Sequence, residues 1–147
     1  MLVRDALVPS PLVVSTDTSL FELIDLILGG NQTTAAVVEN GLLVGIISGQ
    51  DVFEPLLPSY LAMDATLVSV LREDYFEEVL GKLRNIKVGD AMECEVHTVA
   101  PDAPVMEAVS LFLREGLKTV PVVDGKRYVG SVTRRSVLRI IRNCVAE

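Results

Sequence analysis

Hydrophobic residues recur along this chain with the spacing of helices in some stretches and of strands in others. Apolar side chains repeat every three or four residues over Leu20–Leu28, directly after the polar turn Ser15–Thr18, which predicts a helix. Two short apolar runs follow, Ala35–Val38 and Leu43–Ile47, and the Glu39–Gly41 segment between them is typical of a hairpin turn. The pattern therefore predicts a helix, a β-hairpin and then a second helix.

The same pattern occurs twice. Val3–Phe53 aligns with Val88–Leu138 without a gap, and many of the aligned residues are identical. Each copy has the order β-α-β-β-α, so the chain is predicted to be an internal duplication of the mixed α/β (α+β) class. In the second copy we expect one helix over about Pro104–Glu115 and a last helix over Ser136–Asn143. Pro121 has no amide donor, so we expect it at a strand start or a bulge.

The chain divides accordingly into residues 1–57 as the first copy, 58–87 as a connecting segment and 88–147 as the second copy. In the connecting segment, apolar and charged residues alternate as in an amphipathic helix, with an expected break near Asp64–Thr66. Two interpretations of this segment remain open: it packs against the two copies, or it mediates self-association.

Charge and composition narrow the function. Half of the residues are hydrophobic, and the formal net charge is -7. This excess of negative charge argues against binding nucleic acid or an anionic membrane, because both need clustered Lys and Arg, although one local basic pocket remains compatible with it. Cys94, Cys144 and the single His97 form no zinc or Cys-His pattern. Unpaired cysteines, the lack of a signal peptide and the lack of a membrane-length apolar run predict a soluble cytoplasmic protein.

The second hairpin strand of the first copy ends in a short polar motif. Ser48 and Asp51 have the spacing of a capping box, in which a hydroxyl and a carboxylate satisfy the first free amides of a helix. In the second copy Thr133 and Ser136 stand at the aligned positions, so the carboxylate is missing there. Taken alone, the motif predicts a helix start rather than a binding site.

Several motifs occur in the same order in both copies. Val-x-Asp-Ala opens each copy at Val3–Ala6 and Val88–Ala91, two valines and an acidic residue follow in the first hairpin strand, and Gly-x-x-(Ser/Thr) ends the second strand. In these features the chain resembles the cystathionine-β-synthase (CBS) domain family, and in particular a tandem CBS pair, or Bateman module. The resemblance implies two copies packed with pseudo-two-fold symmetry. It also implies two clefts, which in many members bind adenosine-containing ligands such as AMP, ADP, ATP or S-adenosylmethionine.

The resemblance further implies that the strand-end motif binds the ribose of such a ligand. Gly45, Ser48 and Asp51 match the full pattern, and a carboxylate can accept two hydrogen bonds from a ribose diol. A serine in that position carries no charge and loses this paired contact. We therefore expect one competent ribose site governed by Asp51, and a weak or empty site at Ser136.

The resemblance also places adenine and phosphate contacts before the first hairpin strand of each copy and at the start of the last helix. A cation at a helix start favours an anion through both its charge and the free amides. The open alternative is that these cations are solvated surface residues. The candidates are Thr33, Thr34, Ala35, Ala36, Lys118, Thr119, Pro121, Thr133, Arg134 and Arg135.

The favoured interpretation is a non-enzymatic regulatory module that senses an adenosine compound between the copies and passes the change to a partner or to its own dimer. An alternative is a structural or dimerisation module with empty clefts and no physiological nucleotide. An enzyme is disfavoured because Asp51 and Ser48 have no base-orienting partner, metal set or paired carboxylate at a recognisable spacing. No cofactor or metal is expected. The resemblance implies a homodimer, and the sequence does not name the effector protein.

Overall fold

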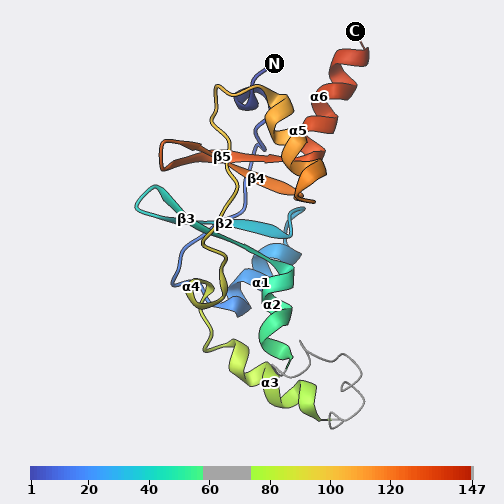
Figure 1. The fold of residues 1–147 in the computed structure, drawn as a ribbon. Helices are drawn as coiled ribbons and strands as arrows, with labels where there is room; N and C mark the ends of the chain where they lie inside the picture. The colour runs from blue at the N-terminus through green and yellow to red at the C-terminus, as the bar shows by residue number, and fades with distance from the viewer. Residues whose placement is uncertain (58–73, 147) are drawn as a thin grey trace.

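The computed structural model describes residues 1–57 and 74–146, and it confirms the mixed α/β class (Figure 1). Figure 1 shows the two hairpins in the middle of the molecule, with α5 and α6 beyond one hairpin and α1, α2 and α4 beyond the other. The elements are η1 (Val3–Ala6), β1 (Val13–Val14), α1 (Leu20–Leu28), β2 (Thr34–Glu39), β3 (Leu42–Ser48), α2 (Gly49–Phe53), η2 (Glu54–Leu56), α3 (Tyr75–Leu83), α4 (Val88–Ala91), α5 (Val105–Arg114), β4 (Thr119–Asp124), β5 (Arg127–Thr133) and α6 (Arg134–Ala146).

Local chemistry accounts for the element boundaries in the first copy. The Ser19 hydroxyl accepts a 3.0 Å hydrogen bond from the amide of Glu22 and so begins α1. The helix ends at Gly29, as the sequence predicts. The β2–β3 hairpin turns at Asn40 and Gly41, whose φ angles of 52° and 81° suit these two residue types.

The duplication extends to the register of the strands. In the first copy Thr34 lies opposite Ser48, and in the second copy the aligned Thr119 lies opposite Thr133. Both hairpins carry a register shift at the aligned position, between Val37 and Val38 in one and between Val122 and Val123 in the other. The hairpins meet at their tips, where Leu42 pairs with Arg127, to give the strand order β1-β2-β3-β5-β4.

The opening turn of each copy packs in the core of the other copy. Val3 and Ala6 of η1 belong to a buried cluster with Phe112 and Val120 of the second copy, and Val88 of α4 belongs to the buried cluster of the first. We call η1 and α4 the exchanged turns. Figure 1 shows η1 beside α5 and α4 beside α1.

Equivalent hydrogen bonds hold both exchanged turns. The Val3 amide donates to the Ala103 carbonyl (2.9 Å), and the aligned Val88 amide donates to the Thr18 carbonyl (2.7 Å). Past the turns, the chain adds a bond to the opposite hairpin: Val8 donates to Ser131, and the aligned Glu93 donates to Ile46, each at 2.8 Å. The two copies are therefore interlocked by backbone contacts at both ends.

Two boundaries differ from the sequence-based expectations. Pro121 is the third residue of β4 rather than a strand start, and the register shift comes after the residue that follows it. Its carbonyl accepts from Val99, so its nitrogen faces that outer edge and no bond of the β4–β5 ladder is lost. The last helix, α6, begins at Arg134, two residues earlier than expected, and continues to Ala146.

The connecting segment is helical where the structure describes it. The helix α3 occupies Tyr75–Leu83, and its Val79 and Leu83 side chains are buried while Phe76 is exposed. The expected break near Asp64–Thr66 lies outside the described residues. Among the helices of residues 1–57 and 74–146, none has the length and apolar character that crossing a membrane requires.

Candidate functional site

The capping box predicted at the end of β3 is present. The Ser48 amide donates to the Asp51 carboxylate at 2.8 Å, and the Ser48 hydroxyl donates to the same oxygen at 3.3 Å. The aligned residues of the second copy do the same with a hydroxyl, because Ser136 accepts from the Thr133 amide at 2.9 Å. The Thr133 hydroxyl in turn accepts from the Ser136 amide at 3.0 Å. Both copies therefore begin their last helix with a capping box, whether or not a carboxylate is available.

Asp51 is buried beside a second carboxyl group. Its exposed fraction is 3%, and it faces Glu93, which follows the exchanged turn α4. The Asp51 charge raises the pKa of Glu93 above its ordinary value, and burial, the Glu54 charge and a hydrogen bond to Asp51 add to the same effect. The surroundings of α2 therefore carry several negative charges close together.

Gly45 is explained by the neighbouring chain segment. A side chain at this position would meet the Met92 sulfur at 2.7 Å and the Glu93 carbonyl at 2.9 Å. The aligned Gly130 is approached by Leu7, which is the residue aligned with Met92. Both glycines therefore make room for the segments that follow the exchanged turns. The role in ribose binding expected of Gly45, Ser48 and Asp51 stays a prediction.

A cavity of about 590 Å³ lies at the start of α6. We call it the strand-end pocket. Three parts of the chain meet there. They are the segment after η1, the turn before β2, and the region where the start of β4 lies beside the end of β5 and the start of α6. Its lining residues are Val8, Pro9, Ser10, Gly30, Asn31, Gln32, Thr33, Lys118, Thr119, Thr133, Arg134, Arg135, Ser136 and Arg139.

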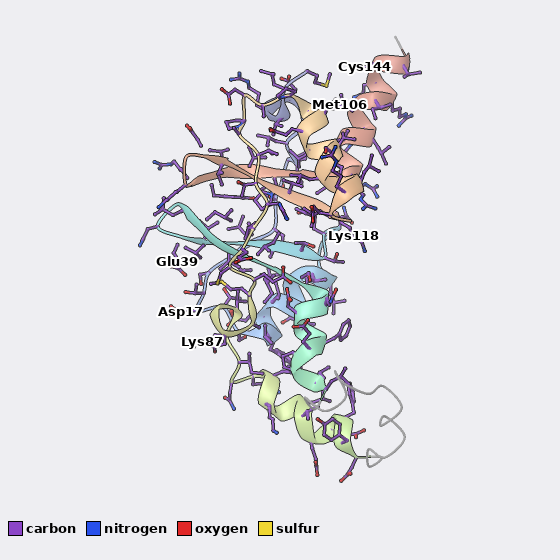
Figure 2. The ribbon with its side chains drawn as sticks, viewed as in Figure 1. Asp17, Glu39, Lys87, Met106, Lys118 and Cys144 are labelled. Carbon is purple, nitrogen blue, oxygen red and sulfur yellow. The ribbon has the colours of Figure 1, made fainter. Side chains whose placement is uncertain are left out.

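The lining of the strand-end pocket is strongly cationic. It includes Lys118, Arg134, Arg135 and Arg139, and among residues 1–57 and 74–146 no Asp or Glu contributes to it. The Arg134 amide donates to the Lys118 carbonyl at 3.2 Å, which holds the residue before β4 beside the start of α6. Figure 2 shows Lys118 at this end of the two hairpins. On a chain with a net charge of -7, such a concentration of positive charge is a local feature that suits an anionic ligand.

The cationic side chains of the strand-end pocket differ in their contacts. Arg134 donates from Nε to the Leu117 carbonyl at 2.9 Å and from a terminal nitrogen to the Phe112 carbonyl at 3.1 Å, so it holds the end of α5. Within residues 1–57 and 74–146, no hydrogen bond or ion pair engages the side chains of Lys118, Arg135 and Arg139. These three side chains remain available to a ligand.

The structure brings together some of the candidate residues but not all. Thr33, Lys118, Thr119, Thr133, Arg134 and Arg135 line the strand-end pocket. Gly45 lines a smaller cavity of about 190 Å³. The remaining candidates line neither cavity, and Ala35, Ala36, Pro121 and Asp51 are buried. These remaining candidates are Thr34, Ala35, Ala36, Pro121, Ser48 and Asp51.

Sequence reasoning missed Arg139 and the segment Val8–Ser10. Arg139 lies four residues after Arg135 and therefore on the same face of α6, so helical spacing could have identified it. The Val8–Ser10 segment carries no comparable signal, because it reaches the pocket only through the exchange of the opening turns.

A comparison with protein families confirms the resemblance found in the sequence. The model of the CBS domain matches residues 3–57 and 88–143. An uncharacterized protein of Methanocaldococcus jannaschii is 30% identical over 154 residues, which is 96% of this chain and 91% of that protein. Three further relatives are much longer, since the chain spans 14% of one and 38% of each of the other two.

Solved structures agree with this fold. The CBS-pair protein CBSX2 from Arabidopsis thaliana has a TM-score of 0.79 at 22% identity, over 99% of this chain and 97% of that one, which is a likeness of fold. The CBS domain pair of protein MJ0100 has a TM-score of 0.66 at 25% identity, over 96% of this chain and 99% of that one. It was solved in complex with 5′-methylthioadenosine and S-adenosyl-L-methionine.

Proposed function

Because this chain belongs to the CBS domain family, and its two matched regions form a pair, we propose that it is a non-enzymatic regulatory module that binds an adenosine nucleotide in the strand-end pocket. The observation that carries this proposal is the cationic cavity. Its volume of about 590 Å³ lies within the range of roughly 300–1,000 Å³ that is usual for small-molecule sites. Lys118, Arg135 and Arg139 supply charge for the phosphates.

A related structure supports the choice of an adenosine compound. The MJ0100 domain pair, 25% identical to this chain, was solved with two adenosine derivatives. Its S-adenosyl-L-methionine carries a sulfonium cation, whereas the described lining of the strand-end pocket in this chain presents cations and no carboxylate. For this chain we therefore favour AMP, ADP or ATP over S-adenosylmethionine.

The position of the pocket gives a mechanism for sensing. Its lining comes from both copies, with Thr33 from the first and Thr133 from the second, and from the Val8–Ser10 segment of the first copy, which follows the exchanged turn η1. A ligand in the pocket contacts all three parts, so it stabilises one arrangement of the copies over others. A second copy of the chain or a separate effector protein would then respond to that arrangement.

Asp51 offers a second ribose position within the same proposal. It keeps the carboxylate that a ribose diol requires, with Ser48 and Gly45 beside it. The geometry favours the strand-end pocket, because Asp51 is 3% exposed and lies against Glu93. The two positions can be distinguished by substitution.

A thermal-shift panel of AMP, ADP, ATP, NAD and S-adenosylmethionine tests the proposal. At a ligand concentration of about a hundred times Kd, binding adds about 2.7 kcal/mol to the free energy of unfolding, which raises Tm by roughly 5 to 10 °C for a chain of this size. Combined Arg135→Ala and Arg139→Ala substitutions should abolish the shift, and Arg142→Ala, which removes an arginine of α6 outside the pocket, should preserve it.

The same panel can overturn the proposal. If Asp51→Ala removes the shift and the arginine substitutions do not, the nucleotide binds at the first copy. If protein shown to be free of ligand gives no shift with any compound, the chain is a structural or dimerisation module. Sedimentation with and without ligand then measures whether a homodimer forms and whether the ligand changes it.

A further inference from the structure

The two helix starts differ in charge at the positions where a ligand would meet them. Ser136 aligns with Asp51, since both accept a hydrogen bond from the backbone amide three residues earlier. Arg139 follows Ser136 by three residues, and the aligned residue after Asp51 is Glu54. Residues three apart share a helix face. That face therefore carries Asp and Glu in the first copy, but Ser and Arg in the second.

The chemistry of Ser136 does not suit a free ribose diol. Its hydroxyl accepts from the Thr133 amide and donates to the Thr133 carbonyl, both at 2.9 Å. A serine hydroxyl has one proton and two lone pairs, so only one lone pair remains for a ligand. In the described part of the chain, the lining of the strand-end pocket offers no Asp or Glu that could accept the second hydroxyl proton. Neutral acceptors such as Gln32 give weaker bonds than a carboxylate.

The side of the strand-end pocket formed by the start of α6 suits a phosphate. Arg135 and Arg139 line the pocket on either side of Ser136 in sequence, and within the described part of the chain neither side chain has a partner. Arginine donates in pairs to phosphate oxygens, which gives both strength and geometric selection.

We propose that the strand-end pocket selects nucleotides whose ribose carries a phosphate on the 2′ or 3′ oxygen in addition to the 5′ phosphate. Ser136 and Arg139 replace the acidic pair of the other copy, so a ribose phosphate is attracted where a free diol would find only neutral acceptors among the described lining residues. This inference rests on the proposed function and adds to it that the ribose of the adenosine nucleotide faces the start of α6.

Isomers of equal composition provide the test. Adenosine 3′,5′-bisphosphate and adenosine 2′,5′-bisphosphate carry the same number of phosphates as ADP. Titration calorimetry therefore compares ligands that differ in the position of the second phosphate at nearly constant charge. We expect at least one bisphosphate to bind about tenfold or more tightly than ADP. Arg139→Gln should reduce that preference severalfold, whereas Arg142→Gln, on the same helix outside the pocket, should leave it unchanged.

The introduction of a carboxylate at one position makes the test sharper. Ser136→Asp copies the residue of the first copy, whose carboxylate makes the same cap, so the helix start is retained. The variant should bind ADP more tightly than either bisphosphate. If wild-type protein binds ADP as tightly as the bisphosphates, the inference fails while the proposed function stands. If none of the three compounds nor AMP binds, the proposed function fails as well.

Discussion

Asp51 and Glu93 show how one residue that caps a helix changes the properties of its neighbour. Asp51 accepts hydrogen bonds from the amide and the hydroxyl of Ser48 and so caps the start of α2. Glu93 lies beside this charge with Glu54 also near, and its pKa is raised above the ordinary value of 4.5. The exchanged turn α4 therefore leads directly into a contact that is unfavourable when both carboxyl groups are ionised.

This contact predicts a pH dependence of stability. A raised pKa means that the folded protein binds the Glu93 proton more tightly than the unfolded chain does. The stabilisation is therefore complete below about pH 4.5 and is lost as the pH rises through the pKa of the folded protein. We expect Glu93→Gln to raise Tm slightly at pH 7 and to flatten the decrease of Tm above pH 4.5. Thermal melts of both proteins from pH 4 to 8 measure this, and superimposable profiles would refute it.

Among the elements, α5 and α6 are bridged by the side chain of Arg134 as well as by their shared buried cluster. Arg134 begins α6 and reaches back to the carbonyls of Phe112 and Leu117 at the end of α5. These acceptors belong to the last turn of a helix and the loop after it, where carbonyls have no partner within the helix. The contact holds the end of α5 against one wall of the strand-end pocket.

Arg134→Ala should therefore lower the free energy of unfolding by about 1 to 2 kcal/mol, because two charge-assisted hydrogen bonds are lost. Urea denaturation measures this change. Amide hydrogen exchange should also become faster in the last turn of α5. Arg142→Ala removes an exposed arginine of the same helix and serves as the control. Equal losses in the two variants would show that the Arg134 contacts add nothing.

The elements themselves could largely be predicted, but their assignment to cores could not. Leu20 and Leu23 recur at helical spacing and are fully buried in α1, and the Glu39–Gly41 turn lies between β2 and β3 as expected. By contrast, Val3 and Val88 occupy equivalent positions in identical motifs, so nothing in the sequence says which core each one joins. The contacts of Arg134 with α5 and the position of the strand-end pocket depend on this tertiary packing, so the sequence did not predict them either.

At the scale of the whole molecule, the exchanged turns couple the stabilities of the two copies. Val3 is fully buried in the second core and Val88 is fully buried in the first. We expect Val3→Ala to cost about 2 kcal/mol through lost burial and the cavity left behind. Hydrogen exchange in β4 and β5 should increase more than in β2 and β3, although residue 3 belongs to the first copy.

The mirror variant is the matched control for this prediction. Val88→Ala should cost a similar amount and should increase hydrogen exchange mainly in β2 and β3. Both variants should still unfold in one transition by circular dichroism, because each copy contains part of the other's core. Two separate transitions, or faster exchange within the copy that contains the substitution, would contradict this account.

The exchange also sets an order of events during protein synthesis. When residues 1–57 have just left the ribosome, Val88, which fills part of their core, has not yet emerged. The turn at Val3 must wait still longer, until Ala103 and the strands after it have been translated. Neither copy can complete its core while the chain is short, so folding is postponed until most of the polypeptide has emerged. The nascent first copy therefore exposes apolar surface for that interval.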